Sequence, residues 1–404
     1  MTLSPSPRDL RVLSLYEGFF AGGARQLHTT VVAGLHAAGR QRHAALSIHA
    51  QVRREATVQR MTDDHRYQLL RAAGVPVTTL GRSTDDGLDP RRFTDVELAR
   101  AAAAVRRADV VMSLKEQPLR LVNQLDGVER PVVACLHRSD PEHQGTALDD
   151  LLVAARTGRL AAVVCCAESA RDAYRDAGVP ASLLRVVPNG INLARFRPVS
   201  CARRLALRGA EGIGPEATVV VFAARFDTMK NPGLFVASAR HFLEREPAGH
   251  VLMCGAGMSE ANPDLVAELD LAFGDRPDLL TRVHALGVRG DMELVFATAD
   301  VVALTSVFGE AAPLCLIEGA MCGAIPVTTP VGDSARIVEG IGFVTGFDPA
   351  EIAETWIQAA ARRDDLGPAL TRVRPRFSHV RMLAGYATLI ERAHRGAGHR
   401  LARV

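Results

Sequence analysis

The sequence contains few aromatic residues and carries little net charge. Aromatic side chains make up 5% of the 404 residues, and the formal net charge at pH 7 is +3. Proteins that bind nucleic acid usually present a strongly basic surface, or aromatic side chains on which bases stack. The composition therefore argues against nucleic acid as a partner of this chain.

Cysteine pairs and long apolar runs are also missing. None of the seven cysteines belongs to a C-x-x-C pair, and Cys165 and Cys166 are adjacent within an apolar run. We therefore expect reduced core thiols rather than disulfides or a zinc site. No apolar run approaches the roughly 20 residues of a membrane span, and the opening residues MTLSPSPRDLR lack the apolar region of a secretory leader. These absences favour a cytoplasmic protein and leave a peripheral membrane contact open.

Apolar β-branched runs alternate with amphipathic segments through most of the chain. With 404 residues, 48% of them hydrophobic, the chain is long enough to bury two ordinary cores. The alternation predicts the α/β class, with parallel sheets covered by helices on both faces. Residues 199–217 are polar and irregular, which suggests the start of a second domain. Strand candidates in the first half are residues 11–16, 44–48, 77–80, 110–114, 132–136, 161–166 and 185–187.

Residues 300–332, DVVALTSVFGEAAPLCLIEGAMCGAIPVTTPVG, carry the strongest functional pattern. Residues 301–304 predict a buried parallel strand, and Pro313 suits the start of a helix. Glu310 lies in the loop before this helix, and Glu318 lies about a turn and a half into it. Backbone N–H groups at a helix start favour an anionic ligand. Carboxylates on either side can accept hydrogen bonds from hydroxyl groups that flank a phosphate. The combination suggests a sugar nucleotide.

The spacing of Glu310 and Glu318, together with the run PLCLIEGAMCGAIPV, resembles the signature of retaining GT-B glycosyltransferases of family 4. Two surface acids around a buried helix would give the spacing alone, but the surrounding run is more specific. The run VVPNGINLARFRP at residues 186–198 resembles the passage between the two domains of that family.

The resemblance implies two Rossmann-like domains that face a central cleft. Residues 1–198 would form an N-terminal domain that binds the acceptor, and residues 199–382 a C-terminal domain that binds the nucleotide sugar. Residues 383–404 would form a terminal helix that crosses back and packs on the N-terminal domain.

Two cations follow a strand candidate at residues 218–223. Arg225 and Lys230 are five residues apart and would, in the simplest interpretation, be charges of a solvated loop. The family that the chain resembles carries the same R-x4-K spacing at its donor diphosphate. Arginine suits bidentate binding of phosphate and lysine acts as a point charge. We therefore predict that both residues stabilise the departing diphosphate during catalysis.

Two further candidates lie in the first half of the chain. His137 directly follows the apolar run at residues 132–136, where ligand-facing groups of parallel sheets lie. A single histidine there is often structural, but the resemblance places it beside the donor sugar, so we assign His137 to the active site. Gly22 and Gly23 form either a tight strand-to-helix turn or, as the resemblance implies, a pair that lets the backbone approach the donor diphosphate.

The resemblance also divides the roles around the predicted helix. Glu310 would lie beside the transferred sugar, Glu318 would bind the ribose hydroxyls, and Pro313 and Leu314 would bind the donor where the helix begins. Gly319 departs from the family, in which alanine usually follows the second acid. Glycine costs roughly 1 kcal/mol inside a helix, so we expect it to let a ligand or the opposite domain approach.

From these patterns we predict a retaining glycosyltransferase of the hexosyltransferase type. It would move a sugar from a nucleotide sugar, expected to be a UDP-sugar, to a hydroxyl of a small-molecule, natural-product or glycan acceptor. No cofactor and no metal are expected, because no Asp-x-Asp pair follows a strand and protein cations can neutralise the diphosphate. The alternatives are a sugar-nucleotide epimerase and a non-catalytic sugar-nucleotide-binding protein. The donor sugar and a homodimer are left open.

Overall fold

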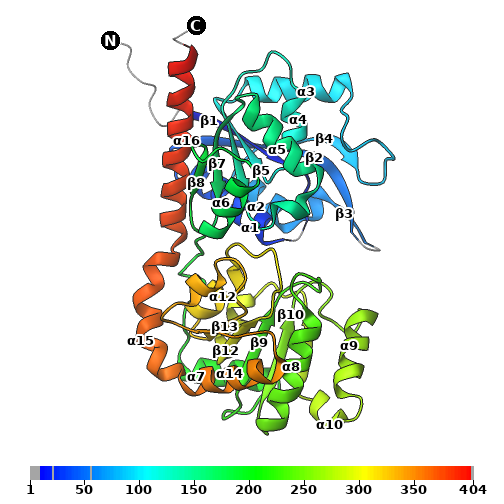
Figure 1. Ribbon diagram of the computed structural model, residues 1–404, viewed down its shortest axis with the longest axis vertical. Coiled ribbons are helices and arrows are strands. Elements are labelled where there is room, and N and C mark those ends of the chain that lie inside the picture. The colour runs from blue at the N-terminus through cyan, green and yellow to red at the C-terminus, as the bar shows by residue number, and fades with distance from the viewer. Residues whose placement is uncertain (1–9, 21, 55–56, 402–404) are drawn as a thin grey trace. The chain divides into compact units, whose positions relative to one another are not determined.

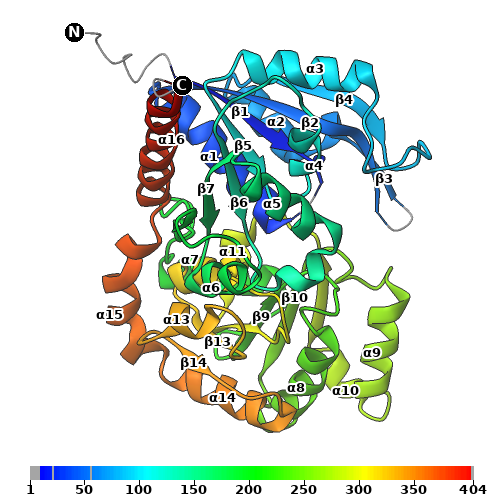
Figure 2. The same ribbon diagram turned by 45° about the horizontal axis from the view of Figure 1, so that its top comes forward.

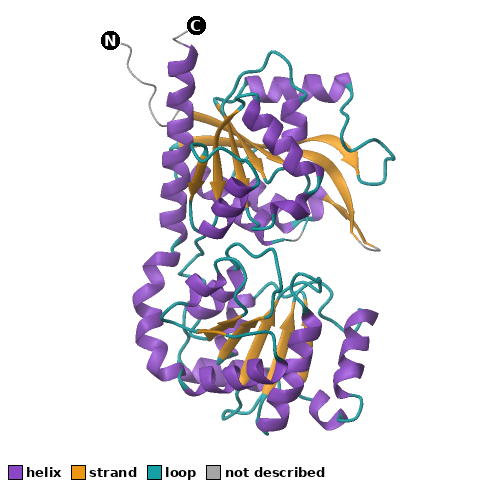
Figure 3. Ribbon diagram, in the orientation of Figure 1, coloured by secondary structure: helices purple, strands orange, loops and turns teal. Residues whose placement is uncertain are grey.

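The computed structural model describes residues 10–20, 22–54 and 57–401 (Figures 1 and 3). Contacts divide the chain into two compact units. The N-terminal unit comprises Met1–Asn189 and Met382–Val404, and the C-terminal unit comprises Gly190–Arg381. Each unit contains a sheet of mainly parallel strands with helices on both faces, which confirms the α/β class and the two Rossmann-like sheets.

In the N-terminal unit, the described strands run in the order β3-β2-β1-β5-β6-β7-β8, and β4 also pairs with β2. All pairs are parallel except β2 and β3, which Figures 1 and 2 show running beyond the rest of this sheet. The elements are β1 (Leu10–Tyr16), α1 (Gly23–Ala37), β2 (Gln41–Arg54), β3 (Thr57–Arg60), α2 (His65–Ala72), β4 (Val77–Ser83), α3 (Asp95–Arg106), β5 (Val110–Leu114), α4 (Leu119–Asn123), β6 (Val132–Leu136), α5 (Thr146–Arg156), β7 (Leu160–Cys165), α6 (Glu168–Asp176), β8 (Leu184–Val186) and α16 (His379–Leu401).

In the C-terminal unit, the strands run in the order β11-β10-β9-β12-β13-β14, and every pair is parallel. The elements are α7 (Cys201–Ala210), β9 (Val219–Ala223), α8 (Pro232–Arg245), β10 (His250–Cys254), α9 (Pro263–Phe273), α10 (Pro277–Leu280), β11 (Val283–Gly287), α11 (Met292–Thr298), β12 (Val301–Leu304), α12 (Leu314–Met321), β13 (Ile325–Thr328), α13 (Ser334–Val338), β14 (Phe343–Val344), α14 (Pro349–Ala361) and α15 (Arg363–Val373).

Helix α7 shows that the expectation of an irregular segment at residues 199–217 is wrong. The Ser200 side chain caps the helix by accepting a hydrogen bond of 3.3 Å from the Arg203 N–H. Arg208 is buried, and its guanidinium donates to the Thr298 carbonyl at 3.0 Å and to Asp300 at 2.6 Å. Apolar periodicity does not indicate this helix, because arginine rather than an apolar stripe forms its buried contact.

The core of the C-terminal unit is built around Trp356 of α14, which is fully buried. Its ring centroid lies 5.1 Å from that of Phe235 and 5.9 Å from that of Phe242, both on α8. Phe235 in turn stacks on Phe222 of β9 at 4.3 Å. Aromatic contacts of this kind add to the free energy gained by burial, so they fix α8 and α14 against the sheet beneath the loops at the strand ends.

Helix α12 packs on β12 at a glycine. A Cβ atom on Gly319 would lie 2.6 Å from the Val302 side chain, which is closer than van der Waals contact allows. The structure therefore explains Gly319 by close packing of helix on strand within the C-terminal unit, and not by the approach of a ligand that we expected. This packing fixes the position of α12, and with it Glu318, on the sheet.

Helix α16 joins the N-terminal unit from Met382 onward. Its Leu383 side chain lies against α1 at Gly34, where an added Cβ would come within 2.8 Å of the leucine. This helix has 23 residues. None of the described helices combines the length and the apolar character that crossing a membrane requires.

The contact at Gly319 predicts the effect of one added methyl group. Gly319→Ala should lower the free energy of unfolding by about 1–3 kcal/mol, because overpacking against Val302 outweighs the gain in helix propensity. Gly209→Ala in α7 is the matched control: a Cβ there meets nothing within 4 Å, so it should raise the free energy by about 0.5–1 kcal/mol. Urea denaturation measures both, and a Gly319→Ala variant as stable as the control would refute the packing role.

Candidate functional site

Three loops at one edge of the C-terminal sheet form the framework of the candidate site. They follow the carboxyl ends of the neighbouring strands β9, β12 and β13, which is where parallel sheets bind ligands. The Thr305 hydroxyl donates to the Lys230 carbonyl at 3.1 Å, and the Thr329 hydroxyl donates to the Ser306 carbonyl at 2.5 Å. These side chain-to-backbone hydrogen bonds join the loops and hold the backbone that carries the candidate residues.

The backbone at Glu310 requires a glycine beside it. Gly332 has φ of +61°, and a Cβ atom at this position would lie 1.8 Å from the Glu310 carbonyl oxygen. The neighbouring Asp333 N–H donates to the Ala311 carbonyl at 2.9 Å. The loop after β13 therefore supports the loop that carries Glu310, and a larger residue at position 332 would displace it.

Lys230 and Glu310, both predicted as catalytic, form an ion pair between Nζ and Oε1. The Ser306 hydroxyl donates to the same carboxylate oxygen at 2.7 Å. Only 15% of the Lys230 side chain and 7% of the Glu310 side chain are exposed. A charge pair shielded from water in this way interacts more strongly than a surface pair, so each group fixes the orientation of the other.

The turn after Lys230 has a left-handed backbone at Asn231, whose φ is +49°. The Asn231 side chain accepts a hydrogen bond of 3.2 Å from the Leu234 N–H and so caps α8, and Pro232 occupies the first helical position. Asparagine tolerates this conformation better than most residues. The turn and the cap make α8 begin after Asn231. Lys230 therefore stays in the loop at the edge of the sheet and is not part of the helix.

Arg225 lies on the same loop, but it is more exposed. Its side chain is 37% exposed and pairs with Asp227 at 2.9 Å. Surface ion pairs of this kind contribute little free energy. The guanidinium can therefore exchange Asp227 for an anionic ligand at small cost.

Helix α12 begins without a side-chain cap. Pro313 has an extended backbone just before the helix, Leu314 is the first helical residue, and the first turn contains no acidic residue. Pro313 supplies no side-chain cap for the N–H groups at this end, and the positive end of the helix dipole lies there. Both features suit the binding of an anion.

Glu318 is half-buried in α12, and within the described residues its carboxyl group forms no hydrogen bond and no ion pair. Burial raises the pKa of Glu318 to about 8, while Arg195 nearby acts to lower it and Glu293 to raise it. Burial also raises the pKa of the Cys315 thiol to about 12, with smaller effects from Lys230, Glu310 and Glu318. These predicted site residues therefore lie around one buried thiol in the C-terminal unit.

In the N-terminal unit, His137 follows β6 directly and is half-buried. Its Nε2 atom is buried without a hydrogen-bond partner among the described residues. Burial lowers the pKa of His137 to about 3, and the positive charge of Lys115 contributes to the shift. The imidazole is therefore neutral at physiological pH, and one ring nitrogen still lacks a partner.

Gly22 and Gly23 lie where α1 begins. Gly23 is the first helical residue, Gly22 precedes it, and neither a side-chain cap nor an acidic residue occupies the first turn. A Cβ on Gly22 would meet only the Arg25 guanidinium, at 3.9 Å. The neighbouring residue 21 lies outside the described residues. The pair thus leaves a second helix N-terminus uncapped, in the same unit as His137.

A charged cluster lies near His137, and it was not predicted from the sequence. Lys115 directly follows β5 with a left-handed φ of +66°, and burial lowers the pKa of its ammonium group. Glu17, after the adjacent strand β1, pairs with Arg25 at 3.2 Å and with Arg120 at 3.3 Å. Unusual backbone and shifted pKa values concentrate at functional sites. One signal was available: Lys115 follows its apolar strand as His137 follows the next one.

The predicted site residues thus form two sets. His137, Gly22 and Gly23 belong to the N-terminal unit, while the other six belong to the C-terminal unit: Arg225, Lys230, Glu310, Pro313, Leu314 and Glu318. Across the part of the chain that the structure describes, no group of three or more His, Cys, Asp and Glu side chains could hold a metal ion.

Family models match both units of the chain. Residues 37–195 match the model of glycosyltransferase family 4, and residues 217–362 match the model of group 1 glycosyl transferases. The chain is 30% identical over 198 residues to D-inositol 3-phosphate glycosyltransferase of Rhodococcus opacus, covering 48% of this chain and 42% of the relative. The enzyme of the same name from Geodermatophilus obscurus is 29% identical over 269 residues, covering 62% and 57%. The matches thus span about half the length of these relatives.

Solved structures with the same fold cover nearly the whole chain. HepE of Anabaena in complex with UDP has a TM-score of 0.77 at 21% identity, covering 95% of this chain and 100% of that one. Sucrose-phosphate synthase of Thermosynechococcus elongatus has a TM-score of 0.68 at 16% identity, covering 96% and 100%. These likenesses show that the chain has the GT-B fold.

The raised pKa of Glu318 predicts a pH-dependent loss of stability. In the unfolded chain this carboxyl group ionises near pH 4.5, whereas in the fold it ionises near pH 8. The folded protein therefore loses stability as the pH rises between these values. Glu318→Gln should remove this loss, so its stability relative to wild type should increase by about 1–3 kcal/mol from pH 5 to pH 8. Denaturation at both pH values measures it, with the exposed Glu339→Gln as control. An unchanged difference would show that Glu318 ionises normally.

Proposed function

Since the chain belongs to the group 1 and family 4 glycosyltransferases, we propose that it moves a sugar from a nucleotide-sugar donor to a hydroxyl group of a small-molecule or glycan acceptor. We propose further that the anomeric configuration is retained and that neither metal nor cofactor takes part. All seven cysteines are free thiols, which supports a reducing compartment such as the cytoplasm.

The observation that carries the proposal is the cluster of Lys230, Glu310 and Ser306 beside the uncapped start of α12. A cation and helix N–H groups are complementary to a diphosphate. A carboxylate held a short distance away is complementary to sugar hydroxyls, which are hydrogen-bond donors. Groups complementary to the diphosphate and groups complementary to the sugar hydroxyls of a nucleotide sugar therefore lie on neighbouring loops of one unit.

A UDP-sugar is the donor that we favour. The Anabaena protein HepE, which shares the fold, was solved with UDP and glucose and also with UDP-glucose. Its identity to this chain is 20% in both structures, so the likeness supports a donor class and leaves the sugar open.

In the proposed reaction, the bond between the sugar C1 and the diphosphate oxygen breaks, and the electron pair leaves with the diphosphate. The acceptor oxygen bonds to C1 on the same face, and its proton passes to the departing phosphate oxygen. Lys230, Arg225 and the N–H groups of α12 stabilise the negative charge that develops. A cation that is fixed in advance and shielded from water does this without having to reorganise, and Glu310 and Ser306 fix Lys230 in this way.

Glu318 acts on the ribose in this proposal. Burial keeps its carboxyl group largely protonated at pH 7. Hydroxyl groups that donate to the carboxyl favour its charged form, so binding of the nucleotide would release a proton. Neutral His137, with one ring nitrogen unpaired, would accept a hydrogen bond from or donate one to the sugar. Gly22 and Gly23 would admit the diphosphate to the start of α1.

The two acids should respond differently to the same substitution. Glu310→Gln should lower kcat by about 100-fold or more and leave UDP affinity near normal, because its contact to the sugar changes during bond cleavage. Glu318→Gln should weaken UDP binding by about 10-fold and raise KM, because ribose is bound alike throughout. Calorimetric titration of UDP and an assay of UDP release from a panel of UDP-sugars measure both effects.

The exposed Glu339→Gln is the matched control and should change neither quantity. Loss of UDP affinity in Glu310→Gln but not in Glu318→Gln would reverse the two roles and refute this placement of the donor. Turnover of a nucleotide sugar into its epimer, without any acceptor, would contradict the proposed transfer itself.

A further inference from the structure

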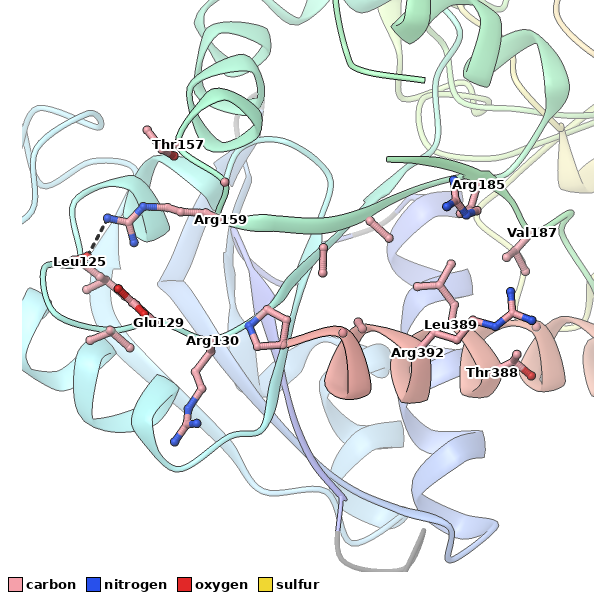
Figure 4. Close-up of a pocket in the computed structure, with 18 of the residues that line it drawn as sticks. Leu125, Glu129, Arg130, Thr157, Arg159, Arg185, Val187, Thr388, Leu389 and Arg392 are labelled. Carbon is pink, nitrogen blue, oxygen red and sulfur yellow. Dashed lines mark hydrogen bonds between the residues drawn. The ribbon is translucent and has the colours of Figure 1, made fainter. Parts of the chain in front are cut away.

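A large groove lies between α16 and the sheet of the N-terminal unit, and no step of the proposed reaction uses it (Figure 4). It encloses about 1040 Å³, at the upper end of the range for small-molecule sites. One face of α16 from residue 384 to 396 forms one wall, and residues 161–162 and 185–187 form the other. The loops at residues 125–131 and 157–159 close one end. We call it the α16 groove.

The α16 groove is separate from the candidate active site. Its lining includes none of the predicted site residues, and the loops that close its acidic end precede β6 and β7 and so lie at the amino ends of these strands, whereas His137 lies at the carboxyl end of β6. Parallel strands place these ends at opposite edges of a sheet. The other end of the groove, at residues 185–187, reaches the carboxyl end of β8, so it is the lining of the groove that distinguishes it from the candidate site.

The apolar part of the lining, which we call the floor of the α16 groove, combines small residues with larger side chains such as Val187 and Leu389. Ala161 and Ala162 on β7 face a wall of α16 that contains Ala384, Gly385 and Ala393. Small side chains on both sides leave space beside Ala384 and Ala393, whereas α16 packs closely at Gly385, where an added Cβ would lie 3.0 Å from the Val187 side chain. Twelve residues of helix advance by about 18 Å, so the unfilled space is long and suits an extended apolar chain.

The rim of the α16 groove carries four arginines and only two acids: Arg130, Arg159, Arg185, Arg392, Asp126 and Glu129. Among the residues that the structure describes, none of these six forms an ion pair. Arg159 donates to the Leu125 carbonyl at 2.9 Å, which Figure 4 shows, and Arg185 donates to the Leu184 carbonyl at 2.7 Å. Each guanidinium has five N–H donors, so most of this donor capacity is available to a ligand.

The charges are distributed unevenly along the α16 groove. Figure 4 shows Arg185 and Arg392 at one end, near Val187, and Glu129 with Arg159 at the other end. Arg185 and Arg392 are both exposed, and both lie away from the acidic residues. This end is therefore the more positive one, and two guanidinium groups there are complementary to one phosphate.

We propose that the α16 groove binds a single-chain anionic amphiphile, with its phosphate between Arg185 and Arg392 and its hydrocarbon chain along the apolar floor. A free phosphate would leave the apolar floor in contact with water. A neutral amphiphile would leave the arginines without a counter-charge. An anionic amphiphile satisfies both parts of the groove at once.

Dodecyl phosphate, used below its micellar concentration, is the probe for a calorimetric titration of the full chain. We expect saturable binding of one molecule. Arg185→Gln and Arg392→Gln should each weaken it by about 10-fold, as loss of a charged hydrogen-bond donor predicts. Ala384→Leu, which fills the groove from an exposed position of α16, should weaken it further. Arg395→Gln is the matched control, because Arg395 is exposed on the same helix and does not line the groove.

Three results would overturn the proposal. Inorganic phosphate that binds as tightly as dodecyl phosphate would show a simple anion site. Dodecyl maltoside that binds as tightly would show a non-specific apolar surface. Equal affinity of dodecyl phosphate for wild type and for all three groove variants, or no binding at all, would show that the α16 groove is not the site. The substituted residues are exposed, so thermal melts of the variants should match that of the wild type.

Discussion

An ammonium group and a carboxylate, held together at the edge of a parallel sheet, are the interaction on which the candidate site depends. Lys230 and Glu310 are both largely shielded from water, so removal of either would leave an uncompensated charge. Ser306 shares the carboxylate, and the hydrogen bonds of Thr305 and Thr329 hold the two loops in place. These contacts organise the site for a ligand that carries both negative charge and hydroxyl groups.

The other predicted ionisable residues differ from this pair in their exposure, charge or partners. They are Arg225, Glu318 and His137. Arg225 is exposed and paired with Asp227, so it can exchange partners readily. Glu318 has no partner and is held near neutral by burial, so it can take up charge when hydroxyl donors arrive. His137 is neutral and keeps one nitrogen unpaired. The predicted residues of the C-terminal unit thus combine a fixed charge pair with groups whose charge or partner can change on binding, and His137 belongs to the other unit.

The sequence predicts those parts of the fold that depend on local pattern. Residues 301–304 and the start of α12 were foreseeable, because an apolar run and a proline act within a few residues. Gly319 was misread, because its reason is Val302 on another element. Helix α7 was missed, because a buried arginine forms its main contact. Chain position alone does not reveal which residues meet across loops.

The candidate site shows the same limit. The motif residues of the C-terminal unit could be named from spacing and resemblance, but their pairing could not, since Lys230 and Glu310 are 80 residues apart. Lys115 was missed although it directly follows an apolar strand, because its left-handed backbone cannot be predicted from a lysine in the sequence. The α16 groove was equally hidden, because it arises where small residues of distant segments face each other.

The central claim is that protein groups alone, with Lys230 foremost, hold the diphosphate of the donor. Calorimetric titration of UDP into the wild-type chain and into Lys230→Met, in buffer containing EDTA, tests it most directly. We expect that wild type binds UDP without any divalent metal and that Lys230→Met binds it at least 10-fold more weakly, as loss of a charged contact requires. UDP binding that appears only when magnesium or manganese is added, or equal affinity in both proteins, would contradict it.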